Sequence, residues 1–388
     1  MKVSVLFVAT VCRHVHGFHR PYLRLLKRMG YDVIVAARYD GTERSLESEG
    51  YRCVNIPFCR KPLQYENLRA YTALCDLLRE TPLLKLVHVH TPVAAFLARM
   101  ALRQTSFSGK VLYTAHGFHF YNGASPVNWM LYYPLEVLAA RYTDGIITIN
   151  HEDYERALRF RLRPNGRVYY VPGVGVDLAC YSYQGDGVRS EVRDELGIKD
   201  RDTVITCVAE INGNKNQIQL VRAMELVKGE IPGARLLLVG EGPYRRQLEA
   251  YVLDRDLRRN VLFLGHRNDI PRLLTASDIG SLVSRREGLS RFVMEAAAAG
   301  LPLVGTDIRG NRDIIVHGRN GYLVPVGDSS ATARWIVALA RDEDLRRSMG
   351  RASVERARAF SLDRVLPMMQ GIYHGYLPKN ASDHDHGC

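Results

Sequence analysis

The sequence lacks most of the features that mark secreted, membrane-spanning and metal-stabilised proteins. Its seven cysteines are an odd number, and no two of them form a C-x-x-C pair. We therefore expect neither a disulfide framework nor a structural zinc site, and the pattern suits a reducing cytoplasm. No apolar run approaches the roughly 20 residues that cross a bilayer as a helix. The short apolar run at residues 3–9 is predicted to be a first strand and not a targeting segment.

The motifs of several other functional classes are missing as well. No G-x-G-x-x-G follows the first predicted strand, where residues 9–12 read ATVC, and this argues against a nicotinamide-dependent oxidoreductase. The chain has no helix-turn-helix spacing, zinc knuckle or aromatic-glycine RNA motif, so nucleic acid is not an expected partner. No Asp-x-Asp pair lies at a predicted strand end. We therefore expect no metal ligands and no obligatory cofactor, although Mg²⁺ could accompany a bound diphosphate.

Positive charge is what the sequence has in excess. The formal net charge is +12 at pH 7. Residues 1–180 hold 23 Lys and Arg against 14 Asp and Glu, whereas the remainder holds 30 against 27. A basic N-terminal half predicts an anionic partner such as phosphate or a membrane surface. We expect a cytoplasmic protein bound peripherally at the inner face of the cell membrane, with basic and aromatic helices at residues 65–79 and 94–103 taking part.

Short β-branched apolar runs alternate with helix-length segments along the whole chain. In the first half, we predict strands at residues 3–9, 32–36, 86–90, 111–115, 145–149 and 168–171, and helices at 21–29, 68–79, 94–103 and 128–142. In the second half, we predict strands at 204–209, 235–239, 261–265, 279–283 and 302–305, and helices at 217–228, 244–253, 291–299, 332–341 and 345–358. This alternation predicts α/β architecture with right-handed βαβ units and mostly parallel sheets.

A glycine-rich break separates the two halves. Residues 172–177 and 184–187 are rich in glycine and short polar side chains, and they are predicted to be a linker. We expect two doubly wound, Rossmann-like domains at residues 1–180 and 181–360. Residues 361–388 would form a C-terminal helix, which could cross back to the N-terminal domain, and a disordered tail. Ligands of such sheets bind beyond the carboxyl ends of the strands, so two such domains facing each other would share a cleft.

The strongest chemical signal lies at residues 284–302, where a predicted strand, a polar loop and a predicted helix follow one another. Glu287 and Gly288 lie in the loop, and Glu295 lies roughly two turns further along, in the helix. Free N–H groups at the start of the helix, beside a glycine that permits close approach, form an anion site suited to a diphosphate. Both carboxylates could accept paired hydrogen bonds from sugar hydroxyls. Alternatively, Glu287 is a solvated loop charge and Glu295 a charge on an exposed helix face.

The surroundings of the two glutamates resemble the E-x7-E region of retaining glycosyltransferases of family 4, which have the GT-B fold. Further stretches that resemble this family lie at residues 171–177, 239–243, 310–315 and 318–324. Stretches similar to its branch for bacterial capsular polysaccharide and exopolysaccharide lie at residues 18–23, 30–33 and 114–120. The resemblance covers nearly the whole chain. It implies two Rossmann-like domains, of which the N-terminal one binds the acceptor and the C-terminal one binds the nucleotide sugar.

The resemblance also implies roles for individual residues of the donor site. Glu287 would hold hydroxyls of the donor sugar, and Glu295 would hold the nucleotide ribose. The backbone at Gly288 and Leu289 would meet the diphosphate. Lys215 matches the phosphate lysine of the family, and a fixed ammonium there would stabilise charge on the departing diphosphate.

Two further residues are carried over in the N-terminal half. His116, directly after a predicted strand, matches the family's histidine near the donor sugar, and it joins Lys215 and Glu287 as a catalytic candidate. Gly17 lies in the first strand–helix loop, where the family's glycine approaches the phosphates. His116 could instead be a structural histidine, because the chain has 13 of them.

The other histidines of the N-terminal half carry weaker predictions. His14, His16 and His19 could suggest metal binding, but no carboxylate lies near them in the sequence. A phosphate or acceptor role is therefore favoured for these three. His88 and His90 are predicted to be strand or strand-end residues.

One position departs from the family pattern. The family usually has an Arg shortly before the phosphate lysine, and Glu210 stands there in this chain. A carboxylate cannot hold a diphosphate directly. Either Lys215 shares the task with another base such as Arg291 or Arg312, or the pocket is organised differently.

We therefore expect a retaining glycosyltransferase that moves a sugar from a nucleoside-diphosphate donor, a UDP-sugar by preference, to a lipid-linked sugar or glycan acceptor in bacterial surface polysaccharide synthesis. Catalysis would rest on stabilisation of the leaving group and on domain closure. The alternatives on the same fold are a sugar-nucleotide epimerase, which would need no acceptor, and a phosphorylase. A non-catalytic regulator that keeps the sugar-nucleotide site is a further alternative, to which Glu210 lends some support.

Overall fold

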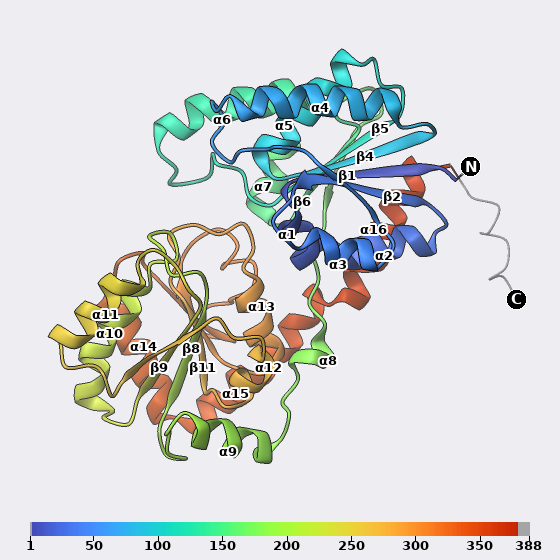
Figure 1. Cartoon of the computed structure of the whole chain (residues 1–388). Helices are drawn as coiled ribbons and strands as arrows, with labels where there is room; N and C mark the ends of the chain where they lie inside the picture. The colour runs from blue at the N-terminus through green and yellow to red at the C-terminus, as the bar shows by residue number, and fades with distance from the viewer. Residues whose placement is uncertain (1, 379–388) are drawn as a thin grey trace, which may run out of the picture. The chain divides into compact units, whose positions relative to one another are not determined.

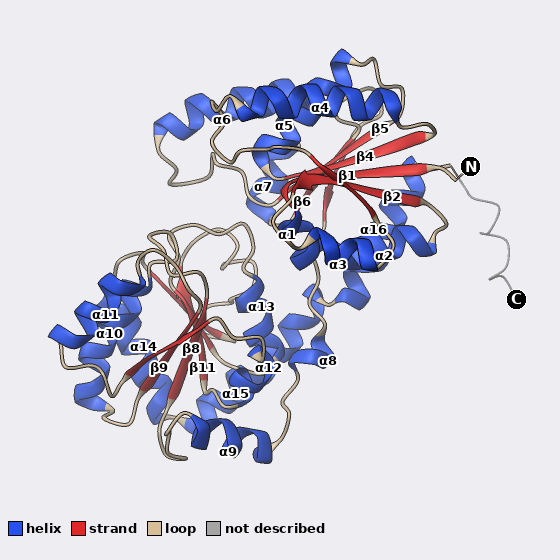
Figure 2. Cartoon of the chain, in the orientation of Figure 1, coloured by secondary structure: helices blue, strands red, loops and turns tan. Residues whose placement is uncertain are grey.

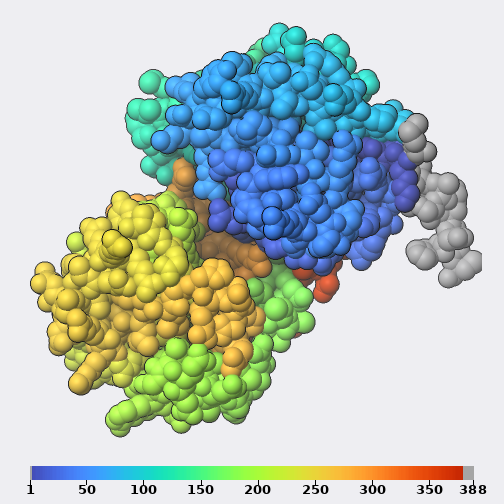
Figure 3. Space-filling view, in the orientation of Figure 1, coloured from blue at the N-terminus to red at the C-terminus, as the bar shows by residue number. Residues whose placement is uncertain are grey.

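The computed structural model describes residues 2–378 and divides the chain into two compact units. The N-terminal unit comprises the residues up to Val174 together with those from Val365 onward, and the C-terminal unit comprises Gly175–Arg364. Each unit is a closely filled body in the space-filling view (Figure 3). The polar tail predicted at residues 382–388 lies outside the described residues.

A parallel sheet of seven strands forms the centre of the N-terminal unit (Figure 2). The strands are β1 (Ser4–Val11), β2 (Asp32–Arg38), β3 (Arg52–Asn55), β4 (Leu84–His90), β5 (Lys110–Ala115), β6 (Gly145–Thr148) and β7 (Arg167–Tyr170). Their order is β3-β2-β1-β4-β5-β6-β7. The winding reverses between β1 and β4, and the carboxyl ends of these two strands are therefore where a doubly wound sheet binds its ligands.

Helices cover both faces of this sheet (Figure 1). They are α1 (Cys12–His14), α2 (Arg20–Arg28), α3 (Glu43–Ser48), α4 (Glu66–Glu80), α5 (Pro92–Gln104), α6 (Pro126–Ala140) and α7 (His151–Ala157). A π-helical turn, Val15–His19, joins α1 to α2. Alternate residues of β1 serve the two faces: Leu6 and Val8 pack in the cluster with α4 and α5, and Phe7 packs in the cluster with α2.

The last helix, α16 (Leu362–Tyr376), completes the second of these clusters. Val365, Met369 and Ile372 are buried in it, on the N-terminal unit. The Tyr373 hydroxyl lies 3.0 Å from Nδ1 of His88 on β4. Helix α16 therefore belongs to the core of the N-terminal unit.

A parallel sheet of six strands, in the order β10-β9-β8-β11-β12-β13, forms the centre of the C-terminal unit. The strands are β8 (Val204–Val208), β9 (Arg235–Val239), β10 (Val261–Gly265), β11 (Ile279–Leu282), β12 (Leu303–Thr306) and β13 (Gly321–Val324). The helices are α8 (Leu178–Tyr181), α9 (Asp186–Glu195), α10 (Gln217–Glu230), α11 (Arg245–Asp254), α12 (Ile270–Thr275), α13 (Arg291–Ala298), α14 (Ser329–Arg341) and α15 (Glu343–Ala357), with a 3-10 turn at Arg358–Phe360. The winding reverses between β8 and β11, so the loops after these two strands lie at the ligand-binding edge of the sheet.

The structure confirms the predicted α/β architecture and extends it. Every predicted strand is present, with ends within two residues of those expected. The edge strands β3 and β13 were not predicted as strands. The predicted linker at 184–187 is wrong in part, since α9 begins at Asp186. The units divide after Val174, six residues before the expected boundary at 180. Among the described residues, no helix is long and apolar enough to span a membrane.

Candidate active site

Two loops at the carboxyl ends of β8 and β11 bring Lys215 and Glu287 together. Lys215 Nζ lies 2.6 Å from Glu287 Oε1. The two side chains are 24% and 11% exposed, so the pair is partly shielded from water. Shielding strengthens the interaction of the two charges relative to a surface pair. The predicted phosphate base and the predicted sugar-binding carboxylate are therefore neighbours, and Glu287 is not a solvated loop charge.

Side chains of the loop before α10 hold Lys215 in place. Asn212 Oδ1 accepts hydrogen bonds from the backbone N–H groups of Asn214 and Lys215, at 3.0 and 2.9 Å. Asn214 also joins this loop to the next one. Its Nδ2 donates to the Arg286 carbonyl at 3.0 Å, and its own carbonyl accepts from the Arg285 N–H at 2.7 Å. The ammonium is therefore carried by a preorganised turn.

The backbone at Gly288 and Leu289 lies just before α13. Ser290 is the N-cap of this helix, and its Oγ accepts from the Val293 N–H at 3.3 Å. Gly310 packs closely against this segment, since a Cβ there would lie 2.6 Å from the Gly288 carbonyl oxygen, and its φ of +83° also favours glycine. The first N–H groups of a helix have no partner within it, so the start of α13 is a suitable place for an anion.

Glu295 lies on α13 and is almost fully buried. Its Oε1 accepts hydrogen bonds from the Tyr181 hydroxyl and from Arg291 Nε, both at 2.7 Å. Burial raises the pKa of Glu295 above its usual value, while the charge of Arg291 and the bond from Tyr181 oppose that shift. A hydroxyl donated by a ligand would favour the ionised carboxylate further. The interpretation of Glu295 as an exposed helix-face charge is therefore wrong.

The bases suggested as substitutes for the missing family Arg are engaged with other side chains. Arg291 pairs with Glu295, and Arg312 pairs with Asp307. Glu210 is exposed. Lys215 and Arg291 are therefore the bases among these residues that pair with a carboxylate of the predicted donor site, Lys215 with Glu287 and Arg291 with Glu295.

Three contacts of this region were not predicted from the sequence. Tyr181 comes from α8, in a stretch next to the predicted linker, and Asn214 comes from a loop of small polar residues. Arg309 is buried, and its Nε donates to the Glu287 carbonyl at 3.2 Å. The one signal in the sequence for Arg309 was its position directly before the stretch 310–315, which resembles the family.

His116 follows β5 directly and lies among other imidazoles. Its Nε2 is 3.3 Å from Nδ1 of His90, and its ring centre is 4.9 Å from that of His14. Burial lowers the pKa of His116 well below its usual value, so the ring is neutral at pH 7. His16 points elsewhere, with its Nε2 3.1 Å from Ser45 Oγ. The structure thus groups His14 with His116 and separates His16 from both.

Gly17 lies in the π-helical turn Val15–His19 and not in an open loop as predicted. It is exposed, and no atom lies within 4 Å of the position that a Cβ would occupy. The fold therefore has room for a side chain here. Packing within the fold therefore does not require glycine at this position, whereas the close approach of a ligand would.

A cavity of about 270 Å³ opens beside the carboxyl ends of β1 and β4. Its lining includes Thr10, His14, Arg60, Thr91, His119 and Tyr132. Thr91 has a φ of +62°, which is rare for a β-branched residue and indicates backbone strain. The Thr10 N–H holds it by donating to Thr91 Oγ1 at 3.0 Å. Strain of this kind concentrates at binding sites, and this cavity lies at the switch point of the sheet.

Comparisons with known proteins show the family of the chain. Residues 188–356 match the family model "Glycosyl transferases group 1", and residues 20–173 match "Glycosyl transferase 4-like domain". The chain is 39% identical over 384 residues to the putative glycosyltransferase EpsD of Bacillus subtilis, covering 99% of both chains.

A second relative and a solved structure cover most of the chain as well. The UDP-Gal:alpha-D-GlcNAc-diphosphoundecaprenol alpha-1,3-galactosyltransferase of Escherichia coli is 27% identical, with 83% of each chain covered. The crystal structure of Anabaena Alr3699/HepE in complex with UDP and glucose superimposes with a TM-score of 0.79 at 19% identity, covering 96% of this chain and all of that one. At this identity the structural likeness shows the GT-B fold and no more.

Proposed function

Because the chain belongs to the glycosyltransferases of family 4, which have the GT-B fold, we propose that it transfers a sugar from a UDP-sugar, with retention, to a lipid-linked sugar acceptor. Glycosyl transfer in polysaccharide synthesis is what its relatives support directly. The donor, the stereochemistry and the acceptor are the proposal.

The contact between Lys215 and Glu287 carries this proposal. The ammonium and the carboxylate lie 2.6 Å apart, at the switch point of the C-terminal sheet and beside the start of α13. They offer one charged group for each half of a nucleotide sugar. The ammonium and the helix start suit the diphosphate, whereas the carboxylate suits sugar hydroxyls. Glu295, held by Tyr181, suits the ribose. The UDP in the HepE structure and the UDP-Gal in the name of the E. coli relative support uracil as the base.

In the proposed reaction, the bond between the anomeric carbon and the diphosphate breaks, the acceptor oxygen bonds to that carbon on the same face, and the acceptor's hydroxyl proton passes to the departing diphosphate. Negative charge grows on the departing diphosphate, and Lys215 lowers the energy of that charge. His116 is proposed to contact the donor sugar, and Gly17 to permit close approach of the phosphates. We propose no obligatory metal for this step.

The proposed acceptor site is the cavity beside β1 and β4. Arg60 and His119 provide hydrogen-bond donors for phosphate, and the start of α5 directly follows Thr91. The E. coli relative is named for a diphosphoundecaprenol acceptor, which supports a lipid-linked diphosphate here. An acceptor of this kind would draw the protein to the cytoplasmic face of the membrane, where the basic N-terminal half meets anionic lipid.

The decisive experiment compares Glu287→Gln with the wild type. We expect transfer from a UDP-sugar to a lipid-linked acceptor to fall by two to three orders of magnitude, on the scale of about 10²–10³ for one lost contact of this kind. The affinity of Glu287→Gln for free UDP should stay within a few fold of the wild-type affinity, because UDP has no sugar that could contact Glu287. Turnover with the donor and calorimetric titration with UDP give both numbers.

A matched control is Glu241→Gln, because Glu241 is an exposed carboxylate on a neighbouring strand-end loop. This variant should turn over normally. Normal turnover of Glu287→Gln would show that the donor site lies elsewhere. Conversion of a UDP-sugar without any acceptor would identify an epimerase instead.

A further inference from the structure

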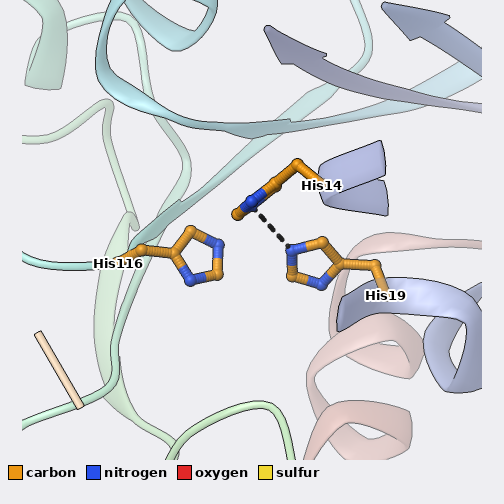
Figure 4. A group of neighbouring side chains, drawn as sticks. All are labelled: His14, His19 and His116. Atoms are coloured by element: carbon orange, nitrogen blue, oxygen red, sulfur yellow. Dashed lines mark hydrogen bonds between the residues drawn. The ribbon is translucent and has the colours of Figure 1, made fainter. Parts of the chain in front are cut away.

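Five histidines gather at one edge of the N-terminal sheet, from four places in the sequence. His14 comes from α1, His19 from the π-helical turn, His88 and His90 from β4, and His116 from the end of β5. His14 Nε2 lies 3.3 Å from His19 Nε2. The ligand nitrogens of His14, His19 and His116 all lie within 4.8 Å of one another. Figure 4 shows these three rings turned toward a common point.

Hydrogen bonding accounts for only part of this cluster. His88 uses both ring nitrogens, one toward the Tyr373 hydroxyl at 3.0 Å and one toward Thr114 Oγ1 at 2.7 Å. By contrast, His19 Nδ1 and His90 Nε2 are buried and have no hydrogen-bond partner. A buried polar atom without a partner is costly, so packing alone is a poor reason to gather these imidazoles. The nitrogens that face each other are other atoms of the cluster, Nε2 of His14 and Nε2 of His19, and a ligand that binds nitrogen could engage both.

The state of the three rings suits such a ligand. Each of the three rings has a nitrogen within 4.8 Å of a nitrogen of the other two, and a neutral imidazole has a lone pair to offer a cation there. His19 is fully buried, whereas His14 and His116 are half-buried, so the group has one shielded and one accessible side.

We propose that His14, His19 and His116 bind one divalent transition metal ion, of the chemistry of Zn²⁺. Zinc–nitrogen bonds of about 2.0–2.1 Å in tetrahedral geometry place two ligand nitrogens roughly 3.3–3.4 Å apart. The nitrogens of His14 and His19 already stand at that separation, and small ring rotations bring in His116. A set of three imidazoles selects zinc and its neighbours in the periodic table over Mg²⁺ and Ca²⁺, which prefer oxygen ligands.

Three protein ligands leave one position of the ion open. In such sites that position takes water or an anionic oxygen. The ion would sit beside the cavity lined by His14 and Arg60, where a phosphate oxygen is the natural fourth ligand. This site is in the N-terminal unit, whereas the diphosphate site proposed around Lys215 is in the C-terminal unit, and His116 is the one residue that both proposals use. Metal binding itself does not rest on the proposed function.

Titration of the full chain with ZnCl₂ after removal of metals by a chelator tests the proposal, with calorimetry for affinity and elemental analysis for stoichiometry. We expect the wild type to bind one equivalent of Zn²⁺. His14→Ala and His116→Ala should bind it at least tenfold more weakly, because loss of a metal ligand lowers the affinity at least as much as loss of a residue that hydrogen-bonds to a ligand. Substitution of Co²⁺ should give the visible absorption of a four-coordinate ion in the wild type alone. MgCl₂ should give no such binding.

The matched control is His16→Ala, in the same segment but with its ring near Ser45. It should keep the wild-type affinity within about twofold. Melting temperatures of the metal-free variants show whether each one folds, and His14→Ala should, because that ring is half-buried. Absence of zinc binding by the wild type, or equal affinity in the wild type and a folded His14→Ala, overturns the proposal. Loss of transfer in Glu287→Gln would be unaffected by either outcome.

Discussion

At the scale of single residues, the donor site depends on charges that are matched before any ligand arrives. Lys215 and Glu287 neutralise each other while partly shielded, and Glu295 is stabilised by Tyr181 and Arg291. An unpaired charge in such surroundings would be costly, because removing it from water is not compensated. The pairs therefore keep the site ordered, and a nucleotide sugar can take over each group by offering a phosphate to the lysine and hydroxyls to the carboxylates.

The first residue-scale prediction concerns Lys215→Ala. We expect kcat to fall by two to three orders of magnitude with a much smaller change in KM, since the ammonium matters most as charge builds on the leaving diphosphate. Lys228→Ala is a matched control, because Lys228 is a half-buried lysine of the same unit that donates to backbone carbonyls after α11. Steady-state kinetics on both variants decides the matter. A rise in KM at unchanged kcat would assign Lys215 to ground-state binding only.

At the scale of single elements, α6 differs from every other helix of the N-terminal unit. One side of it is buried, and there Glu136 accepts a hydrogen bond at 2.8 Å from the fully buried Arg99 of α5. The opposite side exposes a continuous apolar row, formed by Val127, Met130, Leu131, Leu135 and Leu138. These positions recur at the helical spacing and lie on one face. An exposed apolar row of this length on a basic unit suits the interface of an anionic membrane.

The structure changes which elements should meet the membrane. Helix α5 was expected to offer a basic surface, yet Arg99 is one of six buried residues among the 13 of this helix. Of the stretch at residues 65–79, Tyr65 and Leu68 are exposed at the start of α4. The apolar row of α6 is therefore the better candidate for contact with lipid.

The element-scale prediction is that Met130→Glu with Leu131→Glu reduces recovery on anionic vesicles in a flotation assay. Two charges in the apolar row oppose both insertion and attraction to anionic lipid. The matched control is Leu253→Glu on α11, whose side chain is 53% exposed against 50% for Leu131. Binding of the wild type should weaken as salt rises, because exposed charges are screened within about 8 Å at physiological ionic strength. Equal recovery of the wild type and both variants on anionic vesicles would contradict the proposed membrane contact. Equal recovery of the wild type on neutral and on anionic vesicles would contradict it as well.

At the scale of the whole molecule, helix α16 is part of the core that is built by the first strands of the chain. Helix α16 buries Met369 and Tyr373 against the sheet of the N-terminal unit, while the preceding α15 belongs to the C-terminal unit. The N-terminal unit is therefore built from two separate stretches of sequence, and its stability depends on residues that are distant from one another in the chain.

This arrangement predicts where two matched substitutions act. Met369→Ala should destabilise the N-terminal unit by about 2–5 kcal/mol, as for other large-to-small changes in a core. Met349→Ala on α15 should do the same to the C-terminal unit, because Met349 is equally buried there. Hydrogen exchange resolved by peptide should show faster exchange in β1 and β2 for the first variant, and in β8 and β12 for the second. Faster exchange in the C-terminal unit for Met369→Ala would contradict the assignment of α16.

The sequence was sufficient for the features that depend on local pattern. Alternation of apolar runs with helix-length segments predicted the α/β class and the position of almost every strand, because periodicity of burial is written into neighbouring residues. Glu287 and Glu295 were found in the same way, from a strand, a glycine loop and a helix in succession. Lys215 and His116 came from resemblance to a family, and their roles stay predictions.

The remaining features depend on residues that are distant in the chain, and tertiary structure alone decides these. Lys215 and Glu287 are 72 positions apart, Tyr181 and Glu295 are 114 apart, and His88 and Tyr373 are 285 apart. His88 and His90 looked like ordinary strand residues, and a phosphate or acceptor role was favoured over metal binding for His14 and His19. The gathering of these rings with His116 was not predicted, because nothing local records which strands become neighbours. That order is set by packing of helices on both faces of the sheets, a property of all the contacts together.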